Sequence, residues 1–97
     1  MTMNVIGFDW DDGNWPKCGK HGLTKQDIES VFIMGPAVYP DIAHSRGEER
    51  FQAIGKNAQE RWVFVAFTLR HANDETLIRP ISARYMHQKE IDHYEQR

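Results

Sequence analysis

The sequence predicts an α+β protein in which a single antiparallel meander sheet packs against helices. Three observations predict this class: a helical pattern in residues 24–34, several strand patterns in succession between residues 37 and 84, and a second helical pattern in residues 87–96. Consecutive strands with short connections pair antiparallel, which gives the meander. With 97 residues, one hydrophobic core suffices, and we expect one domain over residues 1–97.

The N-terminal part predicts a short strand followed by an irregular segment. Residues 4–10 alternate loosely between apolar and polar side chains, as a short strand does. Four glycines or prolines interrupt residues 11–22, which indicates a loop, with a helical turn around residues 15–20. Pro16 suits the first position of such a turn, where no backbone N–H is required.

A helix is expected to begin after Thr24. Asp27 stands three residues later, in a variant of the capping box, and Gly35-Pro36 ends the helix. Its apolar stripe consists of Ile28, Val31 and Phe32.

The middle of the chain is rich in strand patterns. Residues 37–42 form a strand in which Pro40 indicates an edge position or a bulge, and residues 49–56 form the next one. Residues 61–70, RWVFVAFTLR, give the strongest pattern, and because both faces are largely apolar we expect this strand to be central and covered on both sides.

The last third of the chain continues the sheet and then closes with a helix. After a loop at residues 71–75, residues 77–84 form a strand in which Pro80 requires an edge position or a bulge. Residues 87–96 form the closing helix, with Ile91 and Tyr94 on its buried side.

Composition narrows the function classes. Apolar residues make up 40% and charged residues 27%, as in ordinary globular domains. The lone Cys18 excludes an internal disulfide framework and favours the reducing cytosol, and neither a membrane span nor an export signal is evident. A net charge of −2 argues against indiscriminate nucleic-acid coating. Residues 61–73 and 76–89 nevertheless lack acids, which predicts either a locally positive face or simply a solvated surface.

Several arginines are expected at strand ends or sheet margins. Side-chain alternation places Arg70 on the face of Trp62, and it places Arg79 and Arg84 on opposite faces of their strand. Two guanidinium groups beside an imidazole would bind phosphate oxygens well. The alternative is that each arginine pairs with an acid such as Glu48, Glu49 or Glu60, and spacing alone does not choose.

Two of the five histidines lie in suggestive surroundings. His21, in Lys20-His21-Gly22, precedes a helix, whose N-terminal dipole favours anions, and His87 follows the basic strand. Cys18 and His21 have a two-residue gap, but no second pair completes a tetrahedral site, so neither a metal nor a cofactor is expected.

An ordered set of short motifs resembles the BrnT toxins of bacterial type II toxin–antitoxin modules. The motifs are Phe8-Asp9-Trp10-Asp11, Lys20-His21-Gly22, Val31-Phe32, His44-Ser45-x-Gly47-Glu48-Glu49-Arg50, Ile54-Gly55, Thr68-x-Arg70, Ile78-Arg79-Pro80-Ile81-Ser82-Ala83-Arg84, Glu90 and Tyr94-Glu95. They span nearly the whole chain. The chain departs from the family in residues 14–19, where members commonly carry a charged helical run.

The resemblance implies a fold similar to RelE-like ribonucleases and metal-independent RNA cleavage that inhibits translation and growth. It also implies a hetero-oligomer with a ribbon-helix-helix antitoxin similar to BrnA, with operator DNA bound only through that complex. Our hypothesis is attack of a 2′-hydroxyl on the adjacent phosphate, with the base and the acid not yet assigned between two candidates. The expected catalytic residues are His21, Glu49, Arg70 and Arg84, the two arginines as phosphate clamps, and the expected RNA contacts are Lys20, Arg50, Arg79 and His87.

Two rival classes remain. A non-catalytic protein-interaction module, acting only within a repressor complex, would use the same arginines and aromatic residues as a protein interface. An autonomous DNA-binding transcription factor ranks below it, because no expected helix carries a dense basic face.

Overall fold

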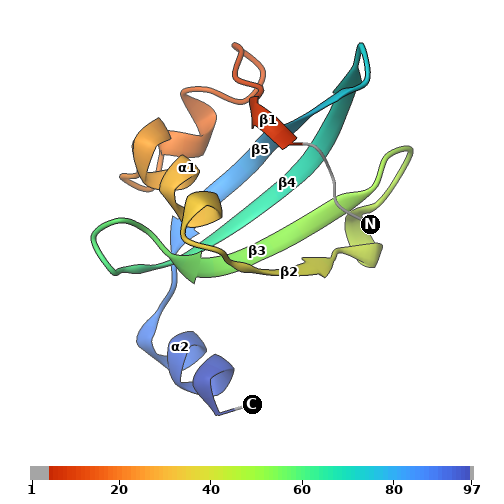
Figure 1. The fold of residues 1–97 in the computed structure, drawn as a ribbon. Helices are drawn as coiled ribbons and strands as arrows, with labels where there is room; N and C mark the ends of the chain where they lie inside the picture. The colour runs from red at the N-terminus through yellow and green to blue at the C-terminus, as the bar shows by residue number, and fades with distance from the viewer. Residues whose placement is uncertain (1–4, 97) are drawn as a thin grey trace.

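The computed structural model describes residues 5–96 and confirms the α+β class (Figure 1). Two 3-10 turns, η1 and η2, accompany the helices and strands. In chain order the elements are β1 (Val5–Phe8), η1 (Lys17–Gly19), α1 (Lys25–Ile33), β2 (Ala37–Pro40), η2 (Ile42–His44), β3 (Arg50–Lys56), β4 (Trp62–Ala72), β5 (Glu75–Tyr85) and α2 (Gln88–Glu95). Asn4, the first residue of the expected N-terminal strand, lies outside the described residues.

The five strands form one sheet in the order β1-β5-β4-β3-β2. Strands β2 to β5 pair antiparallel in succession, as the meander prediction requires. The prediction is wrong for β1, which pairs parallel with β5, so the sheet is mixed. A parallel pair needs a long crossover connection, and here everything between β1 and β5 supplies it. The likeness to RelE-like ribonucleases stays a prediction.

Local sequence determines the limits of α1 as expected. The Thr24 hydroxyl accepts a hydrogen bond from the Asp27 backbone N–H at 3.0 Å, and the Asp27 carboxylate accepts one from the Thr24 N–H at 2.9 Å. These bonds satisfy N–H groups that the first helical turn leaves unpaired. Gly35 then ends the helix with a φ of +84°, which glycine adopts without strain.

The core lies on one face of the sheet, beneath α1 (Figure 1). Ile28 and Val31 of α1 are completely buried against the inward side chains of β3 and β4, which include Val63 and Val65. The expectation that β4 is covered on both sides is wrong for most of its length. On its other face only Thr68 is buried and Trp62, Phe64 and Ala66 are half-buried, because α1 packs on the core face and α2 reaches the opposite face at one end alone.

The β4–β5 hairpin is longer than the sequence suggests. The ladder continues to the pair Ala72 and Glu75, so the predicted loop at residues 71–75 shrinks to a two-residue turn. Asn73 and Asp74 occupy that turn with φ values of 52° and 65°. Positive φ at both positions is typical of a type I′ turn, which asparagine and aspartate tolerate and which matches the twist of the strands.

A bulge in β5 changes which residues share a face. Phe67 pairs with Pro80 while Ala66 pairs with Ser82, so Ile81 is the extra residue. Pro80 thus lies at a bulge, as predicted, although β5 is an internal strand between β1 and β4. Because the extra residue reverses the alternation, the prediction of opposite faces for Arg79 and Arg84 is wrong. Arg79 pairs with Thr68 and Arg84 with Phe64, which lie on the same face of β4.

Candidate functional site on the open face of the sheet

The side of the sheet opposite α1, which we call the open face, carries most of the candidate residues. Its cross-strand rows follow from the pairing of β3, β4 and β5. One row is polar and basic, the next is small and polar, and the third combines apolar residues with a cation. The rows are Arg50-Thr68-Arg79, Gln52-Ala66-Ser82 and Ile54-Phe64-Arg84.

The segment before α1 adds further cations along the edge of β5 that β1 leaves uncovered. Asn14 attaches this segment to the sheet: its side-chain N–H groups donate to the carbonyl oxygens of Asp9 and Pro80, each at 2.9 Å. Its side-chain oxygen accepts from the Asp11 N–H at 2.9 Å. The side chain is therefore fully bonded although the residue is only 2% exposed. The anchor places η1 beside β5.

Lys20 and His21 line a cavity together with Arg84. This cavity, of about 240 Å³, is also lined by Phe64 and Ser82, and we call it the Lys20–Arg84 cavity. An imidazole, an ammonium group and a guanidinium group thus line one cavity. Three of the predicted site residues, from the η1 loop and from β5, therefore meet at one place.

A second cavity, of about 210 Å³, lies farther along the same face. Arg50 and Arg79 line it with Thr68, Glu48 and, from η1, Lys17. We call it the Arg50–Arg79 cavity. Two predicted RNA contacts from separate strands thus come together here.

Three arginines are held by carboxylates, which was the alternative left open by the sequence. Arg70 pairs with Glu48. Arg84 donates two hydrogen bonds to Glu90, at 2.8 and 2.9 Å, and its guanidinium lies 4.8 Å from the centre of the Phe64 ring. The bonds from Arg84 and from the His87 backbone lower the pKa of Glu90 from 4.5 to about 2.

Arg79 is bound by two acids from the segment after β1. It contacts Asp9 at 3.2 Å and Asp11 at 2.9 Å. The hydrogen bond from Arg79 is the main reason that the pKa of Asp11 is lowered, and the same bond raises the pKa of Arg79. Each partner stabilises the charged form of the other.

Other basic side chains on this face have no acidic partner. Within residues 5–96, the side chains of Lys17, Lys20, His21 and Arg50 form no ion pair and no hydrogen bond. The charges of the two lysines and of Arg50 are therefore fully available to an anionic ligand, whereas a guanidinium already bound to a carboxylate is available only in part.

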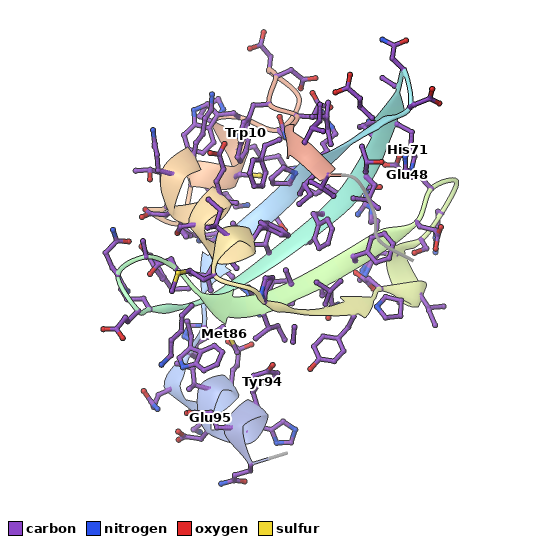
Figure 2. The ribbon with its side chains drawn as sticks, in the orientation of Figure 1. Trp10, Glu48, His71, Met86, Tyr94 and Glu95 are labelled. Carbon is purple, nitrogen blue, oxygen red and sulfur yellow. The ribbon has the colours of Figure 1, made fainter. Side chains whose placement is uncertain are left out.

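Not all predicted site residues come together. Arg70 pairs with Leu77 and Arg84 with Phe64, so six β4 residues, about 20 Å, separate the two arginines. One phosphate cannot contact both. Glu49 lies in a different cavity with Glu48 and His71, at the end of the sheet far from Tyr94 (Figure 2). His87 precedes α2, where its backbone N–H donates to Glu90.

Sequence reasoning missed Lys17 and the function of Asn14. Lys17 stands three residues before Lys20, a spacing that puts both on one side of a helical turn, and this signal was available. Nothing in the sequence shows that Asn14 bonds to Pro80, 66 residues away.

No three His, Cys, Asp or Glu side chains among residues 5–96 form a group able to hold a metal ion. No helix in this range has the length and apolar character that crossing a membrane requires.

The fold and the open face define a small α+β protein with a cationic surface along a mixed sheet. Residues 10–90 match the model of a family described as the ribonuclease toxin, BrnT, of type II toxin–antitoxin systems. The chain therefore belongs to the BrnT family of ribonuclease toxins, and the resemblance inferred from its motifs is confirmed. A comparison with curated proteins gave no match.

Proposed function

We propose that this chain is a metal-independent endoribonuclease whose reaction takes place in the Lys20–Arg84 cavity. The observation that carries the proposal is the meeting of His21 with Lys20 and Arg84 on the open face. Family membership supports ribonuclease chemistry in general. An imidazole that shares a cavity with two cations can supply the proton transfer and the charge stabilisation that cleavage of a phosphodiester requires.

The proposed step uses RNA's own 2′-hydroxyl. Its oxygen attacks the adjacent phosphorus, the bond from phosphorus to the 5′-oxygen breaks, and the products carry a 2′,3′-cyclic phosphate and a 5′-hydroxyl. One proton leaves the 2′-oxygen and one reaches the leaving oxygen. His21 takes part in this proton transfer, while Lys20 and Arg84 stabilise the additional negative charge on the phosphoryl oxygens.

Arg84 can bind a phosphate without leaving Glu90. A guanidinium has five N–H donors, and the two hydrogen bonds to Glu90 occupy two of them. Glu90 fixes the plane of the guanidinium, so little side-chain entropy is lost when a phosphate binds.

The Arg50–Arg79 cavity is proposed to bind a second phosphate of the same strand. On β4, four residues separate the row of Arg79 from the row of Arg84, which is about 13 Å. A short single-stranded segment would lie across the intervening row of Gln52, Ala66 and Ser82. Lys17 and Arg50, which form no ion pair within the described chain, would supply most of the attraction.

The proposed partner is a ribbon-helix-helix antitoxin similar to BrnA, since a type II toxin family implies an antitoxin. Binding over the open face would block RNA, and the hetero-oligomer, rather than the toxin alone, would bind operator DNA. Free toxin would then cleave RNA in the cytoplasm and inhibit translation and growth.

The test is to incubate the partner-free chain with single-stranded RNA in EDTA. We expect cleavage with cyclic-phosphate ends, and a rate at least about tenfold lower for Arg84→Ala. The matched control is Arg46→Gln, because Arg46 is an exposed arginine in the loop after η2. We expect this variant to keep the wild-type rate. Cleavage that depends on added divalent metal, or an unchanged rate in Arg84→Ala, would refute the proposal.

The carboxylate pairing of three arginines favours one alternative, a non-catalytic interaction module. That alternative predicts no cleavage by the partner-free chain under any condition, together with an unimpaired antitoxin complex.

A further inference from the structure

A further and larger cavity lies between the open face and α2. It has a volume of about 380 Å³ and an apolar floor of Ile54, Phe64 and Met86. Tyr94 forms a wall from α2, and Lys89 and His93 stand at the same helix. Figure 2 shows Met86 and Tyr94 in the space between the end of the sheet and α2. We call it the α2 cavity.

We propose that the α2 cavity binds an unpaired nucleobase of the RNA, next to the phosphate at which the strand is cleaved. The inference rests on the proposed function and adds a subsite to it. The occupant is a base of single-stranded RNA, held by ring contacts with Tyr94 and the apolar floor.

Position is the first argument. The α2 cavity and the Lys20–Arg84 cavity share two lining residues, Phe64 and Arg84. A phosphate bound at Arg84 therefore lies at the entrance of both. The nucleotide next to that phosphate has the α2 cavity within reach of its base, and no movement of the sheet is required.

The chemistry of the lining is the second argument. An apolar, aromatic slot with cations at its margin matches a base that carries phosphates on either side. Arg84 and Lys89 supply those cations, and the His93 side chain lines the same cavity. Glu90, which pairs with Arg84, also lines the cavity. Lys89 forms no ion pair within residues 5–96, and an apolar side chain of a protein would fill the slot but offer Lys89 no counter-charge. The volume is within the range of pockets that hold small ligands.

The attachment of α2 is the third argument. No residue of this helix is fully buried, and its contacts with the sheet include the Glu90–Arg84 pair and the ring contact of Tyr94 with Trp62, at 5.4 Å. The helix is therefore not packed flat against the sheet along its length. Beside these contacts, Lys89, His93 and Tyr94 of the helix and Ile54 and Phe64 of the sheet line the cavity.

The experiment measures binding of an octaribonucleotide in which every ribose is 2′-O-methylated, which prevents attack by the 2′-oxygen. Eight further copies each carry one abasic position. For the full-length wild type we expect a loss of affinity of about fivefold or more at one or two adjacent positions, because a stacked base contributes that much.

Two cavity variants assign that loss to the α2 cavity. Tyr94→Ala removes the wall and Ile54→Phe narrows the floor, and in both the abasic penalty falls below about twofold, while Arg46→Gln keeps it. A penalty that persists in both variants overturns the inference.

The remaining outcomes separate the two proposals. An oligonucleotide that binds without any abasic penalty overturns the nucleobase subsite and leaves the proposed function intact. If no oligonucleotide binds, both proposals fail. If the cavity variants weaken the antitoxin complex instead and leave base discrimination unchanged, the occupant is a protein side chain and the inference is wrong.

Discussion

The candidate catalytic residues differ in how their charges are neutralised. His21 and Lys20 line a cavity and form no ion pair within residues 5–96, whereas Arg84 in the same cavity is held by Glu90. A cation that already has a partner is rigid, and a cation without one is available. In the proposed reaction, the fixed guanidinium would orient a phosphate, and the available ammonium group of Lys20 would attract it beside the His21 imidazole.

Comparing His21→Ala with Glu49→Gln decides between the two proton-transfer candidates. Because only His21 shares a cavity with Lys20 and Arg84, we expect His21→Ala to lower the cleavage rate at least about tenfold, and Glu49→Gln to have a clearly smaller effect. Single-turnover rates with one RNA measure both. A larger loss of rate in Glu49→Gln than in His21→Ala would indicate that the reaction takes place at the end of the sheet that carries Glu48 and Glu49.

The Glu90–Arg84 pair predicts an acid-sensitive attachment of α2. The folded pKa of Glu90 is about 2, below its ordinary 4.5, so its contribution to stability is complete above about pH 4.5 and is lost as the pH falls toward 2. Trp62, which contacts Tyr94 of α2, reports this loss in its NMR indole signal. In the Glu90→Gln variant we expect α2 to be detached from Arg84 already at pH 7. The Trp62 indole signal of this variant should then show no further change between pH 4.5 and 2.

At the scale of elements, the bulge of β5 determines the composition of the open face. In a regular strand, Arg79 and Arg84, five residues apart, would lie on opposite faces, and the bulge at Ile81 places them on the same face. Pro80 in a strand pattern indicated a bulge, but the position of the bulge can be read only from the pairing with β4. The bulge also explains why Ile78 and Ala83 are both buried although they are five residues apart.

Local signals were sufficient for some elements only. The capping residues of α1 and the apolar run of β4 predicted those elements, because neighbouring residues determine them. The parallel pairing of β1 with β5 depends on contacts between residues about 70 positions apart, which no local pattern contains. For the same reason the sequence could not show that Arg70 and Arg84 are separated, or that Lys20 and His21 lie beside Arg84.

Asn14→Ala should destabilise the protein and disturb the site together. The change removes the bonds to the carbonyls of Asp9 and Pro80, which become buried without partners, at a cost of about 1–3 kcal/mol. Urea unfolding measures the stability, and RNA cleavage measures the position of the η1 loop. The control is Asn73→Gly in the exposed hairpin turn, where glycine fits the positive φ and stability stays nearly unchanged. If Asn14→Ala and Asn73→Gly changed the stability equally, the role of Asn14 as an anchor would be contradicted.

At the scale of the whole molecule, a net charge of −2 coexists with a cationic face. Some of the acids are used within the site, as Asp9 and Asp11 are on Arg79. In the proposed function, attraction to RNA would therefore come from a few contacts and should be specific to this face. General affinity for polyanions is not expected from a protein with this overall charge.

Salt dependence measures how many of these contacts RNA makes. Each phosphate contact on single-stranded RNA contributes about 0.7 to the slope of log affinity against log salt. Arg50→Gln should lower that slope by about one such contact, and Arg46→Gln should leave it unchanged. Equal slopes in the wild type and Arg50→Gln would place the RNA elsewhere on the molecule.

The central claim is that RNA's own 2′-hydroxyl is the nucleophile and that the open face supplies everything else. The most direct measurement compares an unmodified single-stranded RNA with its fully 2′-O-methylated copy, incubated with the partner-free chain in EDTA. We predict cleavage of the first, with a cyclic phosphate at each new 3′ end, and none of the second. Cleavage of both RNAs, or of neither until a divalent metal is added, would contradict the account.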